Sequence, residues 1–324
     1  MAGRASAARG ERVTDKAAGQ QVIVRRAMGF TRRLRNSRVW LTLVCLMAFG
    51  LAAARGQSTG ITLTPAVVEA GSPVLIRVQA AGAKGVDGEW LGRKLEFFRG
   101  RGGKGWFALA GVDVETPEGP STLEIAIHTK RGVRELSRTV EILPAQYSTA
   151  SLTVEPEYVE PGPEALNQIE AEEQLKAKVF GASAPKALWT GNFRRPVAAP
   201  MGESFGTRRI FNGKLASIHK GLDFRARTGT PVRAGNGGVV ALARPLYYEG
   251  NCVVIDHGMG LFTISMHLSR IDVKEGQRVT RGSRVGLSGD TGRVTGPHLH
   301  WGVRWQGAYL DPGKLLRMKL GGVR

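Results

Sequence analysis

The chain has 324 residues, 42% of them hydrophobic and 23% charged, which is enough apolar material for two globular domains joined by a linker. Its formal net charge of +19 is concentrated at the two ends, because residues 1–54 hold ten Lys and Arg against two Asp and Glu, and residues 201–324 hold 19 against 8. A basic domain can bind nucleic acid, but no helix-turn-helix, RNA-recognition or zinc-finger spacing is present. We therefore exclude nucleic acid and expect a polyanionic neighbour, such as a phosphate-bearing wall or envelope polymer.

Residues 1–54 predict an export segment. Basic residues crowd up to Arg38, a mainly apolar run follows from Val39 to Ala54, and small residues close it. These are the parts of a secretory signal, and the run is shorter than the roughly 20 residues of a membrane span. We expect export to the periplasm, the cell envelope or the extracellular space, with membrane attachment only if the segment stays uncleaved. After cleavage Cys252 is the one cysteine left, so no internal disulfide is expected.

Residues 57–145 predict a small, immunoglobulin-like β-sandwich. Short β-branched and apolar runs alternate with turns rich in Gly and Pro, which is typical of such sandwiches. A spacer and a docking module fit this domain equally well. The predicted strands are 61–64, 74–78, 94–98, 106–109, 122–127 and 139–142.

Residues 146–195 predict a linker with one helix. Three prolines break its first part, and 163–180 then has helix-forming composition, with acidic residues early and Lys176 and Lys178 late. A helix in a linker is by default solvated. Its candidate apolar stripe consists of Leu166, Ile169, Leu175 and Val179.

Residues 196–318 predict a second β domain in which glycines punctuate nearly every strand junction. Gly289-Asp290-Thr291-Gly292 superficially resembles a phosphate-binding loop, but the Lys-Ser/Thr and the helix that should follow are missing, so we reject nucleotide binding. The predicted strands are 231–234, 238–242, 252–256, 261–266, 277–279, 284–287 and 298–303.

Five of the 6 histidines fall in the last third of the chain. His219 and Asp223 stand four residues apart and offer one nitrogen and one oxygen ligand. His298 and His300 alternate with Leu299 in a predicted strand, so their side chains point to the same face. His219, Asp223 and one histidine of that pair would give a metal three ligands and leave a fourth position for water, as in catalytic zinc sites. The other histidine of the pair could then handle a proton. His267 stands alone in an apolar, strand-like context, where a histidine is more often a satisfied core residue, and only the neighbouring motifs make it a candidate.

These motifs, in this order, resemble the lysostaphin-like (LytM-type) zinc metallopeptidases that cut peptidoglycan, over about residues 196–316. Ser265 departs from the pattern, because relatives usually carry Tyr two residues before the middle histidine. The motifs are His219-Lys220-Gly221-Leu222-Asp223, His267-Leu268-Ser269, Gly296-Pro297-His298-Leu299-His300, Phe205-Gly206-Thr207-Arg208-Arg209, Gly229-Thr230-Pro231-Val232, Gly250-Asn251, Asp256-His257-Gly258 and Thr291-Gly292-Arg293-Val294-Thr295-Gly296.

The resemblance implies a LytM-type antiparallel sheet folded over a narrow groove, with one zinc ion on its floor. It implies His219, Asp223 and His300 as zinc ligands and His298 as general base. His267 would form a hydrogen bond with the water or the developing oxyanion. The expected function is that of a secreted zinc-dependent endopeptidase that hydrolyses peptide bonds in peptidoglycan stem peptides or cross-links.

Two other functions compete with this one. The first is a non-catalytic LytM-type domain that binds and activates a cell-wall amidase. Such domains typically lose zinc-binding or base residues, whereas all five positions are filled here. The second is a secreted structural metal-binding domain, which is disfavoured because structural zinc sites usually close all four positions with Cys, and only Cys252 is available.

Overall fold

The structure is a computed structural model that describes residues 60–103, 105–321 and 323. These residues belong to one compact unit, Ser58–Arg324. The predicted export segment, 1–54, lies outside the described residues. Within the described part of the chain, no helix is both long enough and apolar enough to cross a membrane.

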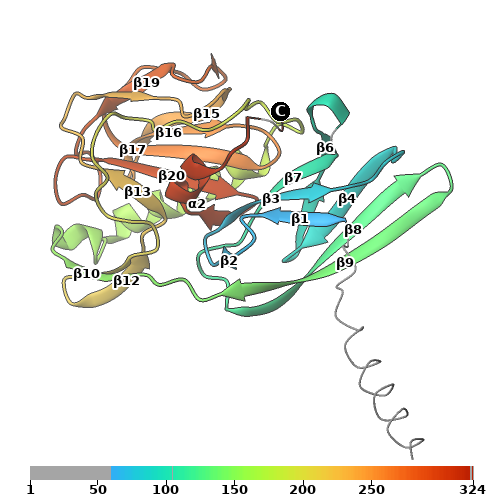
Figure 1. The fold of residues 1–324 in the computed structure, drawn as a ribbon. Helices are drawn as coiled ribbons and strands as arrows, with labels where there is room; N and C mark the ends of the chain where they lie inside the picture. Colours follow the sequence, from blue (N-terminus) through green and yellow to red (C-terminus); the bar gives the residue numbers. More distant parts are fainter. Residues whose placement is uncertain (1–59, 104, 322, 324) are drawn as a thin grey trace, which may run out of the picture. The chain divides into compact units, whose positions relative to one another are not determined.

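The prediction of a mainly β protein is confirmed, and residues 60–143 form two sheets (Figure 1). One sheet has the strand order β1-β3-β7-β6 and the other has the order β2-β9-β8-β4-β5. Val74, Ile76 and Ile125 are among the buried side chains of this part. The immunoglobulin-like character of this part stays a prediction. The elements are β1 (Ile61–Thr64), β2 (Val68–Glu69), β3 (Pro73–Val78), β4 (Gly85–Trp90), β5 (Arg93–Glu96), β6 (Phe98–Arg99), η1 (Arg101–Gly103), β7 (Trp106–Gly111), β8 (Gly119–Thr129) and β9 (Gly132–Leu143).

Strand β4 was not expected from the sequence. It reads Gly-Val-Asp-Gly-Glu-Trp, and only Val86 and Trp90 are buried. The strand is held by its neighbours, because it pairs antiparallel with both β5 and β8. Pairing partners on both sides can impose an extended backbone on a segment whose own composition does not favour it.

The linker contributes a strand as well as a helix. Strand β10 (Thr149–Leu152) pairs in parallel with β11 (Arg208–Phe211), which pairs antiparallel with β12 (Lys214–Ile218). A short 3₁₀ turn, η2 (Pro156–Tyr158), follows β10. The linker is therefore attached to the hairpin that, along the chain, leads directly into the predicted His219 motif.

The predicted linker helix is present as α2 (Pro163–Gly181), but only part of its predicted apolar stripe is correct. Leu175 and Val179 pack against a buried cluster of the C-terminal sheet. Leu166 is 53% exposed, so its place in the stripe was wrong. No residue of the helix is fully buried, and its apolar contacts with the sheet come from its second half.

Polar contacts also dock α2, which is therefore not a solvated linker helix. Lys176 Nζ lies 2.7 Å from Glu249 Oε1. The Glu172 carboxylate accepts hydrogen bonds from the backbone N–H of Tyr247. The Phe180 ring meets Phe262 edge-on, with the ring centroids 5.2 Å apart. These contacts fix the loop of residues 247–249 against the helix.

A nine-stranded sheet carries the predicted site residues. Its main path is β13-β20-β17-β16-β15-β18, with β14 and β19 joined at β17 and with β21 on β20 (Figure 1). Strand β20 therefore lies between β13 and β17. This order brings together the strands that carry Asp223 (β13), His300 (β20) and His267 (β17). The elements are β13 (Gly221–Phe224), β14 (Pro231–Arg233), β15 (Gly238–Leu246), β16 (Gly250–Asp256), β17 (Leu261–Ile271), β18 (Arg278–Val279), β19 (Arg284–Ser288), β20 (Leu299–Trp305), β21 (Ala308–Leu310) and α3 (Pro312–Arg317).

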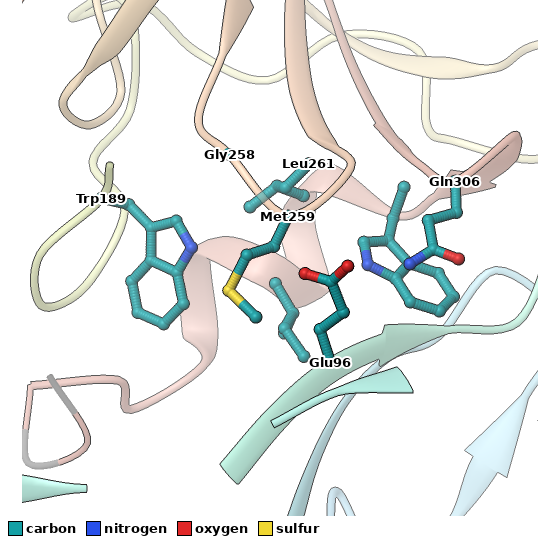
Figure 2. Close-up of a pocket in the computed structure, with 8 residues that line it drawn as sticks. Glu96, Trp189, Gly258, Met259, Leu261 and Gln306 are labelled. Carbon is teal, nitrogen blue, oxygen red and sulfur yellow. The ribbon is translucent and has the colours of Figure 1, made fainter. Parts of the chain in front are cut away.

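The N-terminal sheets contact the C-terminal part around a very small cavity (Figure 2). Glu96 of β5 approaches it from one side, and Met259 and Gln306 line the other. The cavity has a volume of about 10 Å³, which leaves room for about one water molecule. It is too small to be a substrate site, and none of the predicted site residues lines it.

Candidate active site

Strand register places the candidate site at the centre of the nine-stranded sheet. Asp223 on β13 is directly opposite His300 on β20, and His300 is in turn opposite Met266 on β17. His219 stands between β12 and β13, close to Asp223. His298 immediately precedes β20 and pairs with Gly289 through an isolated bridge.

Three donor atoms from His219, Asp223 and His300 converge on one point. His219 Nε2 lies 2.9 Å from Asp223 Oδ1 and 2.9 Å from His300 Nδ1, and His300 Nδ1 lies 3.0 Å from Asp223 Oδ1. All three residues are buried. Among the residues that the structure describes, these three side chains form the cluster of possible ligands that could hold a metal ion.

The backbone around these ligand candidates sets their orientation. His219 Nδ1 donates a hydrogen bond to the carbonyl of Ser204 at 2.9 Å, because a carbonyl can only accept. The proton is thereby fixed on Nδ1, and Nε2 presents a lone pair to the cluster. A Cβ at Gly221 would lie 2.3 Å from His300 Nε2, so the imidazole of His300 rests directly against a strand without a side chain there.

Asp223 uses its two oxygens differently. Oδ1 faces the two imidazoles, while Oδ2 accepts from Arg209 Nη2 at 3.2 Å. Arg209 is itself held by Glu203, to which Nε donates at 2.8 Å. Burial alone would raise the pKa of Asp223, but the contacts of its carboxylate with the His219 and His300 rings outweigh burial and hold that pKa far below its usual range. The carboxylate is therefore ionised, as a metal ligand must be.

His298 and His267 lie beside the three ligand candidates. His298 Nε2 is 3.8 Å from Asp223 Oδ2. The ring centroids of His267 and His298 are 4.9 Å apart, and those of His267 and His300 are 6.1 Å apart. Each of the two rings donates from Nδ1 to a backbone carbonyl at 2.8 Å, His298 to Gly296 and His267 to Thr291. Their Nε2 atoms are thus free to accept a proton.

His267 is held in an unusual backbone conformation. Its φ is +61°, a left-handed value that side chains with a Cβ seldom adopt. Its backbone N–H donates to the carbonyl of Glu249, the residue that Lys176 of α2 pairs with. Burial is the main cause that lowers the pKa of His267 well below its usual value. The ring is therefore neutral near pH 7.

The donor set suits a metal. Two neutral imidazole nitrogens and one carboxylate oxygen are the ligands of many catalytic zinc sites. Their separations of 2.9–3.0 Å are close to the roughly 3.3 Å that tetrahedral zinc with ordinary bond lengths requires. Burial, the first cause, lowers the pKa of His300 to about 4, so its imidazole is also neutral near pH 7. The ligand assignment itself stays a prediction.

The structure brings all five predicted site residues together: His219, Asp223, His267, His298 and His300. It also adds contacts of Arg209, Glu203 and the Ser204 carbonyl that the sequence analysis did not assign. Arg209 stood within a recognised motif, but nothing in its spacing indicated that it would reach the second oxygen of Asp223.

The part of the chain that carries these residues is similar to known peptidases. Residues 217–312 match the model of peptidase family M23. Peptidoglycan DD-endopeptidase ShyA of Vibrio cholerae is 52% identical over 99 residues, which are 30% of this chain and 23% of that protein. Peptidoglycan DD-endopeptidase ShyC of the same organism is 38% identical over 123 residues, which are 37% of this chain and 27% of that one. The matches thus span about a quarter of the length of these relatives.

One solved structure is similar over more than the matched family region. A crystal structure from Pseudomonas aeruginosa, assigned to peptidase M23, superimposes with a TM-score of 0.60 at 28% identity. The similarity covers 76% of this chain and 94% of that chain. The shared fold therefore extends beyond residues 217–312.

Proposed function

The C-terminal part of the chain carries a peptidase family M23 domain of the LytM type, and from this premise we propose that the protein is a zinc-dependent endopeptidase that hydrolyses peptide bonds of peptidoglycan. The relatives named as peptidoglycan DD-endopeptidases support the substrate class. The His219, Asp223 and His300 cluster supports the metal dependence. Phosphate-bearing envelope polymers are proposed as neighbours of its basic surface.

Each residue of the site has a separate task in this proposal. His219, Asp223 and His300 hold the zinc ion, which when bound lowers the pKa of a coordinated water to about 7 and polarises the scissile carbonyl. His298 accepts a proton of the attacking water at Nε2 and returns it to the leaving amine. His267 Nε2, neutral at working pH, accepts a hydrogen bond and orients that water.

One observation carries the proposal. Three donor atoms that could hold a metal ion lie beside two histidines whose Nδ1 protons are both bonded to carbonyls, and this arrangement supports the proposal. A domain that only activates an amidase would need neither three converging metal ligands nor two neighbouring histidines with an Nε2 atom that can accept a proton. A structural metal site would instead surround the ion with four protein ligands.

Digestion of purified sacculi tests the proposal. The zinc-loaded protein should release muropeptides whose masses identify the bond that was cut, and Asp223→Ala should release none. Elemental analysis of the same samples reports zinc. A metal-replete protein that leaves sacculi intact, but stimulates an amidase added to them, would support the non-catalytic alternative.

We also propose that the protein is exported and cleaved near Ala54, on the basic, apolar and small-residue succession at its start. N-terminal sequencing of the mature protein tests this. Recovery of an intact 39–54 segment in the membrane fraction would show an uncleaved anchor instead.

A further inference from the structure

Arg293 lies in the loop that ends at His298, and this loop is pinned next to the site. At its start the Thr291 carbonyl accepts from His267, and the Thr291 hydroxyl accepts from the backbone N–H of Asn251. The Arg293 backbone N–H donates to the Tyr248 carbonyl at 2.9 Å. Since two residues span at most about 7 Å, the Arg293 side chain starts close to His267.

The guanidinium of Arg293 contacts two aromatic rings, which together we call the clamp. It lies 4.8 Å from the ring centroid of Phe211, on β11, and 4.4 Å from that of Tyr248. Both rings hold the charge through cation–π attraction. Rings that contact the face of a planar guanidinium leave the N–H groups along its edge open to a ligand.

No group in the described part of the chain uses those N–H groups. Within residues 60–103 and 105–321, no hydrogen bond or ion pair involves the Arg293 side chain. Glu249, the carboxylate that acts on it from a distance, is already paired with Lys176. Arg209, the neighbouring cation, is paired with Glu203 and Asp223. Among the described residues, the Arg293 guanidinium therefore has no carboxylate paired with it.

We propose that the clamped guanidinium of Arg293 binds a free carboxylate of the substrate, and that the enzyme prefers peptides with a carboxylate close to the bond that is cut. This inference rests on the proposed function and adds a substrate preference to it. A fixed planar fork is the side chain best suited to bidentate binding of a carboxylate. The clamp holds it in place before the substrate arrives, which lowers the entropy lost on binding.

The test uses two synthetic cross-linked peptide dimers, identical except that the carboxylate beside the scissile bond is free in one and a carboxamide in the other. The zinc-loaded protein should cleave the free acid with a kcat/KM about 10- to 100-fold higher, the range expected for charge-assisted hydrogen bonds. Arg293→Met should reduce cleavage of the free acid to the level of the amide and leave the amide unchanged. Arg208→Met, an exposed arginine on β11, is the matched control and should keep the preference.

Two results would overturn the inference while the proposed function stands. One is equal cleavage of both dimers by the unaltered protein. The other is a parallel loss on both dimers in Arg293→Met, which would make the clamp a structural contact. If neither dimer is cleaved, calorimetric binding of both dimers to His298→Ala, with and without Arg293→Met, decides. Equal affinities there would reject the carboxylate site without reference to turnover.

Discussion

The C-terminal β domain holds histidines in two different environments. His257, at the end of β16, is fully buried, with Nδ1 donating to the Gly237 carbonyl at 2.7 Å and Nε2 accepting from the Thr263 hydroxyl at 2.9 Å. His219, His267 and His298 also donate from Nδ1 to carbonyls, but their Nε2 atoms are turned toward the cluster.

Burial therefore does not distinguish a structural histidine from a functional one. Burial lowers the pKa of His257 and of His300 to about 4 alike. The two kinds of histidine differ in the partner of the second ring nitrogen. In His257 that nitrogen accepts a hydrogen bond from a hydroxyl group, whereas in His300 one nitrogen faces the other candidate metal ligands. His257 has both nitrogens satisfied and should serve folding, whereas the cluster has lone pairs that converge and should serve metal and proton chemistry.

The largest effect is expected from removing a metal ligand. His219→Ala and Asp223→Ala each leave two of three protein ligands, so both should lose zinc and cleavage together. Elemental analysis of the purified variants measures zinc, and digestion of sacculi measures activity. Full zinc occupancy in either variant would show that the ligand set is wrong.

His267→Ala should separate rate from metal binding. It removes an acceptor for the water but no ligand, so zinc should remain while turnover falls by about 10²–10⁴-fold. Single-turnover cleavage of a cross-linked muropeptide measures this. A higher KM with an unchanged kcat would mean instead that the ring only shapes the groove.

His257 should control stability rather than catalysis. Its folded pKa of about 4 lies below the ordinary 6.5, so the unfolded chain binds the proton more readily between these values. The free energy of unfolding should therefore fall as the pH drops from 6.5 to 4, by about 3 kcal/mol in total.

Urea unfolding of metal-free protein at pH 7 and pH 4.5 measures this loss. His257→Gln should show a smaller difference between the two pH values, since it cannot titrate. Metal-free samples keep zinc release out of the comparison. The same acid sensitivity in both proteins would mean that His257 is not its source.

The smallest effect is expected from changing Arg209, which contacts the candidate ligand Asp223 but is not itself a ligand. Arg209→Met frees Asp223 Oδ2, and loss of such a supporting contact typically weakens metal affinity by about 10- to 100-fold. Competition with a chelator measures the zinc dissociation constant. Arg208→Met, on the same strand but exposed, should bind zinc normally, and equal affinities of the two variants would refute the supporting role.

Much of the site could be predicted because its residues occur in short motifs. Strand alternation placed His298 and His300 on one face, and both side chains do reach Asp223, although β20 begins only at Leu299. Which nitrogen of each ring is free could not be predicted, because it depends on the carbonyls of Ser204, Thr291 and Gly296, brought near by folding.

The linker shows where the sequence is insufficient. Helix α2 was predicted from composition, but its docking depends on Glu249 and Phe262, which are more than 70 residues away. Strand β10 was missed because its pairing partner, β11, supplies the hydrogen bonds and its own exposed residues show no apolar periodicity.

The central claim is that the two histidines flanking Leu299 have different tasks, and zinc stoichiometry beside single-turnover cleavage tests it most directly. His300→Ala should be metal-free and inactive. His298→Ala should keep its zinc and lose about 10²–10⁴-fold in rate, as expected when a general base is removed. A metal-free His298→Ala protein, or a metal-replete and merely slow His300→Ala protein, would contradict this division of labour.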